Sequence, residues 1–291
     1  MNKTSTARFM LVTSMIIFGT IGLFVRNIQL PSSEIALLRA IFAAILIGAY
    51  LLVTKQKISF SNIKKELLLL LLSGAAMGFN WIFLFEAYKY TTVSAATLSY
   101  YFAPVIVTLL CPLLFREKMK TKQWICFFMS TLGIILITGV DDISASTQHI
   151  TGILLGLCAA VLYATVILLN KFIKNVSGIH RTFLQFISAI VVLLPYTLAT
   201  EGINVSALSI KGWVFLLIVG VLHSGIAYCL YFSSLKELSG QKAAILSYID
   251  PFVAVIMSVS VLGEPMGVMQ VVGGLLILGF TLWNEINVVK K

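Results

Sequence analysis

Charged side chains are scarce in this chain of 291 residues, because Asp, Glu, Lys and Arg together make up only 11% of it. Histidine occurs three times, and no His-Glu-x-x-His motif is present. Such a motif would be expected of a zinc-dependent intramembrane protease. A water-soluble domain has too little interior to hide a composition that is 59% hydrophobic. These shortages exclude a soluble protein and leave an intramembrane enzyme as a remote alternative only.

The few acids and cysteines also offer no metal site. Asp141 and Asp142 are adjacent, but they lie in a polar stretch without further ligands and are typical of a solvated turn. All four cysteines fall within apolar runs and lack the spacing of metal ligands. We therefore expect neither a metal nor another cofactor, and we expect the protein not to be an enzyme.

Ten apolar runs of roughly 17 to 23 residues follow one another with short connections. As helices, each is long enough to cross a hydrocarbon core about 30 Å thick. The first run lacks a small-residue cleavage motif, so we interpret it as a retained helix. The predicted fold is an all-α polytopic membrane protein whose ten spans are approximately 9–25, 32–53, 67–88, 93–115, 122–140, 151–170, 182–199, 211–232, 242–262 and 267–286.

The net charge of +10 follows the predicted topology. If the amino terminus is cytoplasmic, 17 of the 21 Lys and Arg residues fall on the cytoplasmic side, three (Arg26, Lys89 and Lys211) fall outside, and Arg39 lies within a span. Lys and Arg are enriched on cytoplasmic loops of membrane proteins. The sequence therefore predicts a multi-pass protein of the cell membrane with both termini cytoplasmic, in contact with anionic lipids rather than with nucleic acid.

Residues 94–123 recur as residues 241–270 at an offset of 147 without a gap. The offset pairs two prolines, two glutamates and two aromatic positions, among others. The matched pairs are Pro104 with Pro251, Tyr101 with Tyr248, Glu117 with Glu264, Gln123 with Gln270, Gly78 with Gly225, and Phe85 with Phe232. The sequence thus predicts two repeats, 1–140 and 151–291, joined by an extracytoplasmic linker at 141–150.

Five spans per repeat is an odd number, so the second repeat enters the membrane in the opposite orientation. Inverted repeats place a binding site near the midplane, where helix breaks expose backbone polar groups. Pro104 and Pro251 are the matched helix breaks, since proline cannot donate the helical hydrogen bond. The arrangement predicts a carrier with alternating access for a small-molecule substrate. A monomer would suffice, because both halves lie in one chain.

Two polar residues within spans each have a structural alternative. Arg39 would cost roughly 2.5–3.5 kcal/mol at the centre of a membrane, so it needs a partner or a route to water. We expect it to reach the outer interface or to form a structural ion pair rather than to contact substrate. Asn80 is expected to form an interhelical hydrogen bond or to line the substrate site.

Each half has a mid-helix proline, then a glutamate and a glutamine, and the second half continues as LGEPMGVMQVVGGLLILG at 262–279. In these features the chain resembles EamA-type carriers of the drug/metabolite transporter superfamily. The resemblance implies a ten-helix bundle with spans 1, 3, 4, 6, 8 and 9 around a central cavity. It also implies export of amino acids or related metabolites. The first half departs from the pattern, because its last span lacks the double glycine.

Carried onto this sequence, the resemblance points to substrate-binding candidates that are mainly aromatic. They are Asn80, Trp81, Tyr101, Tyr163, His223, Tyr228 and Tyr248, with Phe18 as a further member. Aromatic faces and hydroxyls suit apolar or aromatic side chains and cations. Each aromatic residue taken alone is also consistent with packing.

Coupling to protons needs a titratable group deep in the membrane. Asp250 is the first candidate, with hydrogen bonding to backbone freed by Pro251 as the alternative; His223 is the second, with an interhelical hydrogen bond as the alternative. Import, or transport of sugar-phosphates, nucleotide-sugars or amines, stays open. Phosphorylated substrates would want several basic groups in the cavity, and only Arg39 and Lys242 are candidates.

Overall fold

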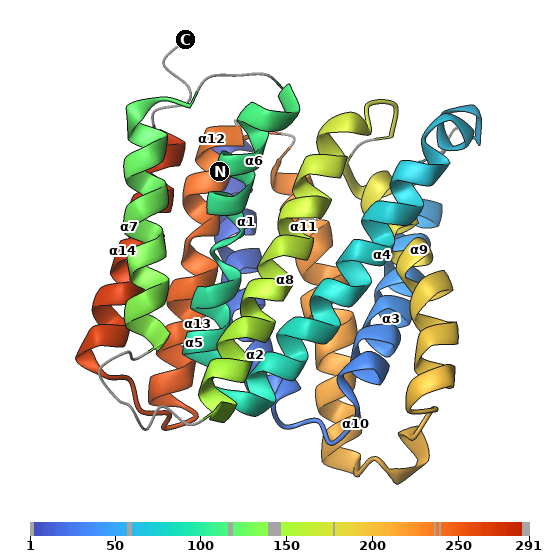
Figure 1. Ribbon diagram of the computed structural model, residues 1–291. Coiled ribbons are helices and arrows are strands. Elements are labelled where there is room, and N and C mark those ends of the chain that lie inside the picture. Colours follow the sequence, from blue (N-terminus) through green and yellow to red (C-terminus); the bar gives the residue numbers. More distant parts are fainter. Residues whose placement is uncertain are drawn as a thin grey trace.

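The computed structural model is a bundle of helices, and the residues that it describes are 3–56, 60–115, 119–138, 147–176, 178–235, 237–238 and 240–286 (Figure 1). No strand occurs among these residues. A helix satisfies all of its backbone hydrogen bonds internally, which a lipid environment demands of a spanning segment. Large apolar side chains such as Phe9, Leu68 and Phe128 are exposed on the outer surface, where lipid would cover them.

The predicted ten spans are present. Among the described residues, eight helical stretches are long and apolar enough to cross a membrane, and two shorter apolar helices complete the set. In chain order the spans are α1 (Lys3–Gly19) with α2 (Ile21–Val25), α3 (Ser32–Val53), α4 (Phe60–Tyr90), α5 (Val93–Tyr100) with α6 (Ala103–Phe115), α7 (Thr121–Thr138), α8 (Thr147–Phe172), α9 (Gly178–Thr200), α10 (Ile210–Leu217) with the π-helix η2 (Ile218–Ile226) and α11 (Ala227–Ser234), α12 (Gly240–Ser247) with α13 (Ile249–Ser260), and α14 (Val268–Ile286). A short 3₁₀ turn, η1 (Val205–Ala207), precedes α10.

The two ends of the bundle are distinguished here by the chain termini. The beginning of α1 and the end of α14 lie at the same end, which we call the terminal end (Figure 1). The other end, where α2 stops and α10 starts, is called the distal end. Because each repeat has five spans, an odd number, the second repeat enters the membrane in the opposite orientation and the repeats are inverted with respect to each other.

The helix breaks occur at positions that the repeat relates. α5 stops at Tyr100 and α6 starts at Ala103, while α12 stops at Ser247 and α13 starts at Ile249. Tyr101 and Tyr248 therefore occupy equivalent breaks, and each proline lies in the first turn after its break, where a missing N–H is tolerated.

A second matched feature is a pair of helix caps. The Gln123 side chain accepts a hydrogen bond from the Lys120 backbone at 2.8 Å, and Gln270 accepts one from Gly267 at 3.1 Å. Both bonds cap the beginning of the last span of a repeat, where backbone N–H groups lack helical partners. Glu117, the counterpart of Glu264, lies outside the described residues, as do Asp141 and Asp142.

Two irregularities have no counterpart in the other repeat. The first span breaks at Thr20, whereas α8 runs uninterrupted through Ile167, the residue 147 positions later. The π-helix η2 interrupts the eighth span, whereas α4 is continuous through the equivalent stretch. π-helical turns are rare and often occur at functional sites.

Small residues bring several helices into backbone contact. A Cβ on Gly19 would lie 2.5 Å from the backbone oxygen of Asp250, so the first span packs directly on the break of the ninth. The last spans of the repeats meet in the same way. Gly133 of α7 lies against the Gly273 backbone of α14, and a Cβ on Gly133 would be 2.6 Å from that oxygen.

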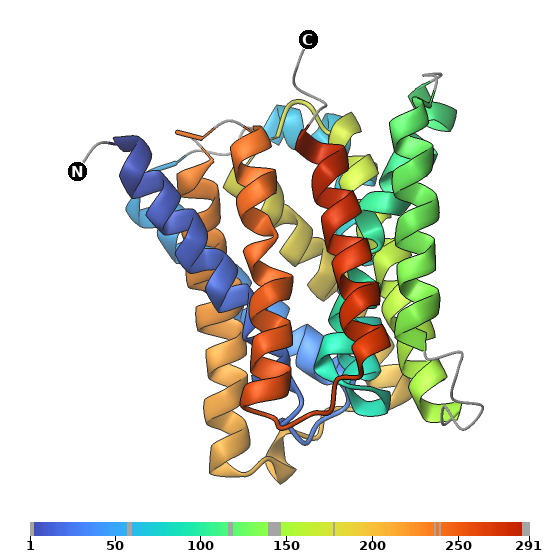
Figure 2. The ribbon, with the colours of Figure 1, turned by 90° about the vertical axis from the view of Figure 1, so that its left-hand side faces the viewer.

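The helices form two lateral groups around a central space. α7 packs on α14 at one side, and α3 packs on α9 at the other, next to α4. Between these groups lie α1, α5, α8, α11 and α13, and Figure 2 shows α1 running obliquely from the amino terminus at the upper left toward the middle of the bundle. The pairing of α7 with α14, one from each repeat, leaves those two spans away from the central space.

Candidate functional site

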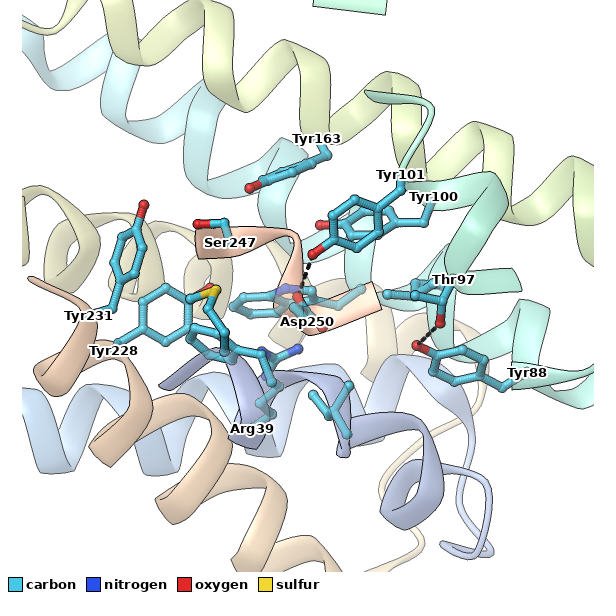
Figure 3. Close-up of a pocket in the computed structure, with 15 residues that line it drawn as sticks. Arg39, Tyr88, Thr97, Tyr100, Tyr101, Tyr163, Tyr228, Tyr231, Ser247 and Asp250 are labelled. Carbon is cyan, nitrogen blue, oxygen red and sulfur yellow. Dashed lines mark hydrogen bonds between the residues drawn. The ribbon is translucent and has the colours of Figure 1, made fainter. Parts of the chain in front are cut away.

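A cavity of about 190 Å³ lies in the middle of the bundle, beside both helix breaks. Seven of the ten spans contribute side chains to it. The lining consists of Met15, Phe18, Ile21, Arg39, Trp81, Leu84, Tyr88, Thr97, Tyr100, Tyr101, Tyr163, Tyr228, Tyr231, Ser247 and Asp250 (Figure 3). These residues come from spans 1, 3, 4, 6, 8 and 9, as the family resemblance implied, and Arg39 is added from span 2. We call this space the central cavity.

Arg39 is 4% exposed, and it reaches the central cavity from α3. Its guanidinium carbon lies 4.3 Å from the centre of the Trp81 ring, and its Nε donates to Ser224 Oγ of η2 at 2.5 Å. Among the described residues, no acid pairs with it and its two terminal nitrogens have no acceptor. Neither expected location of Arg39 is observed, because stacking on Trp81 holds the group inside the bundle.

Asp250 faces the same cavity from the first turn of α13. Its Oδ2 accepts a hydrogen bond of 2.6 Å from the hydroxyl of Tyr101 (Figure 3). Oδ1 has no partner among the described residues, and no cation pairs with this carboxylate there. The bond joins the helix break of one repeat to the acid that follows the break of the other.

Aromatic rings form most of the remaining wall. Tyr100 stacks on Tyr163 with ring centres 5.1 Å apart, and Phe18 meets Tyr228 edge to face at the same separation. The hydroxyl of Tyr88 lies 3.4 Å from that of Thr97. Rings locked by such contacts present fixed faces and hydroxyl groups to a ligand.

The residues that the sequence singled out differ in their position relative to the central cavity. Trp81, Tyr101, Tyr163, Tyr228, Asp250 and Phe18 line the central cavity. Tyr248 and Pro104 instead line a neighbouring pocket of about 150 Å³, which shares Tyr100, Tyr101, Tyr163 and Ser247 with the cavity. Pro251 is buried in the first turn of α13.

Asn80 and His223 lie outside the set of cavity-lining residues. Asn80 Nδ2 donates to the backbone oxygen of Ala159 at 2.6 Å, which is the interhelical bond that the sequence analysis offered as an alternative. His223 is fully buried, with Nε2 3.0 Å from Thr20 Oγ1 and Nδ1 3.1 Å from the Ile218 carbonyl. It therefore joins the break of the first span to the π-helix of the eighth.

Several lining residues were not among the sequence candidates: Arg39, Tyr88, Tyr100, Tyr231 and Ser247. Two of them carried a usable signal. Tyr100 and Ser247 lie four positions before the matched prolines. Their backbone carbonyls lose a helical hydrogen bond, because proline has no N–H to donate. The sequence shows Arg39 as a charge within a span, and only the position of Trp81 in space shows that it turns inward.

A polar cluster closes the distal end. Glu264 pairs with Arg26 and accepts a hydrogen bond from the Val93 backbone N–H at 2.8 Å, while the Ser94 backbone N–H donates to Ser258 at 3.2 Å. Partial burial lowers the pKa of Arg26. We call Arg26, Val93, Ser94, Ser258 and Glu264 the distal cluster. It ties the first span to the fourth and ninth.

The chain is similar to proteins that are named as transporters. An uncharacterized transporter of Bacillus subtilis, YxxF, is 34% identical over 94% of this chain and 89% of its own. An uncharacterized transporter of Archaeoglobus fulgidus is 26% identical over 94% of this chain and 95% of its own. A solved crystal structure that is 16% identical has the same fold, with a TM-score of 0.62 over 94% of this chain and 95% of that one.

The profile of the EamA-like transporter family matches the chain twice, at residues 5–139 and again at 150–284. Each match contains five spans, and the cavity lies between the two matched regions. With its two inverted repeats, this multi-pass membrane protein belongs to the EamA-like transporter family.

Proposed function

We propose that the protein is a secondary carrier that exports small metabolites, amino acids or related compounds in particular, by alternating access. The observation that carries the proposal is the central cavity between inverted repeats, beside their matched breaks at Tyr101 and Tyr248. Its volume of about 190 Å³ exceeds the ~150 Å³ of a protein cavity that holds benzene. A ligand of amino-acid size therefore suits it.

The direction of transport is proposed from the two ends of the bundle. The distal cluster closes one end, while the second pocket extends from the central cavity along α6 and α8, past Pro104 and Ile167, toward the terminal end. The excess of Lys and Arg favours a cytoplasmic terminal end in the plasma membrane. A cavity that loads from the cytoplasm suits an exporter.

Counterflow in proteoliposomes tests the carrier. Labelled amino acids with apolar, aromatic, polar and charged side chains would be exchanged against unlabelled ones, and empty liposomes would serve as the control. We expect saturable exchange of apolar or aromatic amino acids. Exchange confined to sugar-phosphates, nucleotide-sugars or amines would replace the substrate class and leave the carrier mechanism in place.

Asp250 is the proposed coupling group. Its carboxyl faces the cavity, so a proton and a cationic substrate group would compete for the same oxygen atoms. His223 is less suited, because both of its ring nitrogens already contact Thr20 and Ile218. The titratable and charged groups around Asp250 in the cavity are Arg39, Tyr88, Tyr100, Tyr101, Tyr163, Tyr228 and Tyr231.

A pH-sensitive dye inside the vesicles measures the coupling. Substrate flux by the parent should move protons in the opposite direction, and flux by Asp250→Asn should move none. Glu86→Gln is the matched control, because Glu86 is an acid that pairs with Lys89 outside the cavity. Flux without proton movement in the parent would contradict the coupling.

A further inference from the structure

Two opposite charges face the central cavity without pairing with each other. Arg39 comes from the first repeat and Asp250 from the second. Within the described part of the chain, neither belongs to an ion pair. A buried charge is costly unless an opposite charge lies beside it. Each group therefore favours a ligand group of the opposite sign.

The contacts of each group leave particular atoms available to a ligand. The guanidinium group of Arg39 lies over the Trp81 ring, and its Nε donates to Ser224 Oγ. Its two terminal nitrogens have no acceptor among the described residues. Those nitrogens form the fork that binds a carboxylate through two hydrogen bonds. Tyr101 holds Oδ2 of Asp250, which leaves Oδ1 for an ammonium group.

We infer that Arg39 and Asp250 form one receptor for a zwitterion. Arg39 binds the α-carboxylate of an amino acid, Asp250 binds its α-ammonium group, and the side chain lies among the aromatic and apolar residues of the cavity. The inference rests on the proposed carrier function, and it assigns a residue to each end of the substrate.

Ligands with a single charge fit this pair less well. An amine would satisfy Asp250 and leave Arg39 without a counter-charge. A sugar-phosphate would satisfy Arg39 and meet Asp250 with a charge of the same sign. Tyr100 and Tyr228 add aromatic faces to the cavity wall, and such faces attract cations.

The side-chain end of the ligand is set by the apolar part of the lining. Met15, Phe18, Ile21 and Leu84 supply this part, and none of them carries a charge. Large apolar or aromatic side chains would bury the most surface there. Leucine and phenylalanine are therefore the substrates on which the inference is tested.

Two analogue series separate the two ends of the ligand. Phenylalanine is compared with phenethylamine, which lacks the carboxylate, and with 3-phenylpropionate, which lacks the ammonium group. Leucine is compared with 3-methylbutylamine and 4-methylpentanoate. Each compound is tested for inhibition of counterflow and, separately, for a thermal-stability shift of the purified protein. Each single-charge analogue should be at least tenfold weaker than its parent amino acid, which corresponds to about 1.4 kcal/mol.

Two variants test which residue binds which end of the ligand. Arg39→Gln should no longer prefer the amino acid over the amine analogue. Asp250→Asn should no longer prefer the amino acid over the carboxylate analogue. Neither variant should lose both preferences. This crossed result cannot come from a general folding defect. Lys211→Gln and Glu86→Gln, which lie outside the cavity, should keep both preferences.

The outcomes distinguish the inference from the carrier function. Amino-acid counterflow with analogues that inhibit as well as their parents would overturn the zwitterion receptor and keep the carrier. Binding that prefers the zwitterion without any counterflow would support the receptor and overturn the carrier. Absence of both binding and exchange for leucine and phenylalanine would overturn the inference.

Discussion

The two repeats are alike at some positions related by the 147-residue offset and differ at others. Tyr101 and Tyr248 occupy equivalent helix breaks, and Gln123 and Gln270 form equivalent caps. The charges of the cavity are not matched. Arg39 corresponds to Phe186, and Asp250 corresponds to Ala103.

The difference has a physical reason. Alternating access needs two conformations of similar energy, and a scaffold of similar inverted halves favours this. A ligand with unlike ends needs unlike walls, which identical halves would not provide. The scaffold therefore keeps the repeat, while the cavity departs from it.

The largest expected effect comes from making the cavity symmetric. Arg39→Phe combined with Asp250→Ala gives each position the residue of its counterpart. The charge-assisted hydrogen bonds at both ends of the ligand, at roughly 1.5–3 kcal/mol each, would be lost, so counterflow should fall by more than about 100-fold. Counterflow rates and the melting temperature of the purified variant check this. Normal exchange by a folded double variant would contradict the importance of the asymmetry.

A smaller effect is expected from opening the distal end. Glu264→Gln removes the ion pair with Arg26, which is partly buried and should stabilise the closed end by about 1 kcal/mol. A cysteine placed at Ser94 in a background without native cysteines would report access. Its labelling by an impermeant thiol reagent from the distal side should rise roughly fivefold or more. Unchanged labelling would show that the cluster does not hold this end closed.

The two prolines test whether the scaffold is symmetric in function. Pro104→Ala and Pro251→Ala each allow a helical hydrogen bond to form across a break, to Tyr100 or to Ser247. One such bond contributes about 1 kcal/mol, so each variant should slow exchange roughly fivefold, and by similar factors. Exchange rates of the two variants are compared directly. A large effect of one proline alone would show that the breaks are not equivalent.

The smallest effect is expected at the contact between Thr20 and η2, two features that have no counterpart in the other repeat. Thr20→Val removes the contact with His223 that links the break of the first span to η2. Its loss should cost about 1 kcal/mol and lower the melting temperature by a few degrees. Thr165→Val is the control, because Thr165 is partly exposed and bonds only to its own helix. Equal melting temperatures for the two variants would contradict a structural role for this link.

Much of the fold was accessible from the sequence. Lipid forces helices on a chain of this hydropathy, so ten apolar runs predicted ten spans, and the end of α3 at Val53 agrees with the run predicted there. The internal offset predicted inverted repeats with breaks near Pro104 and Pro251. These features depend on residues near one another in the sequence or on a repeat that is visible within it.

Which polar residues meet depends on how the spans pack. Arg39 and Asp250 are 211 positions apart, and nothing local indicates that both face one cavity, or that Trp81 holds the arginine inside the bundle. The break at Thr20 and the π-helix at His223 also carry no distinctive local pattern. They depend on packing between spans 1, 2 and 8, where Gly220 lies against Phe42. The spans and their symmetry follow from the amino-acid sequence alone, because lipid acts on each segment separately. Only the packed bundle determined the chemistry of the cavity, because that chemistry arises between segments distant in the chain.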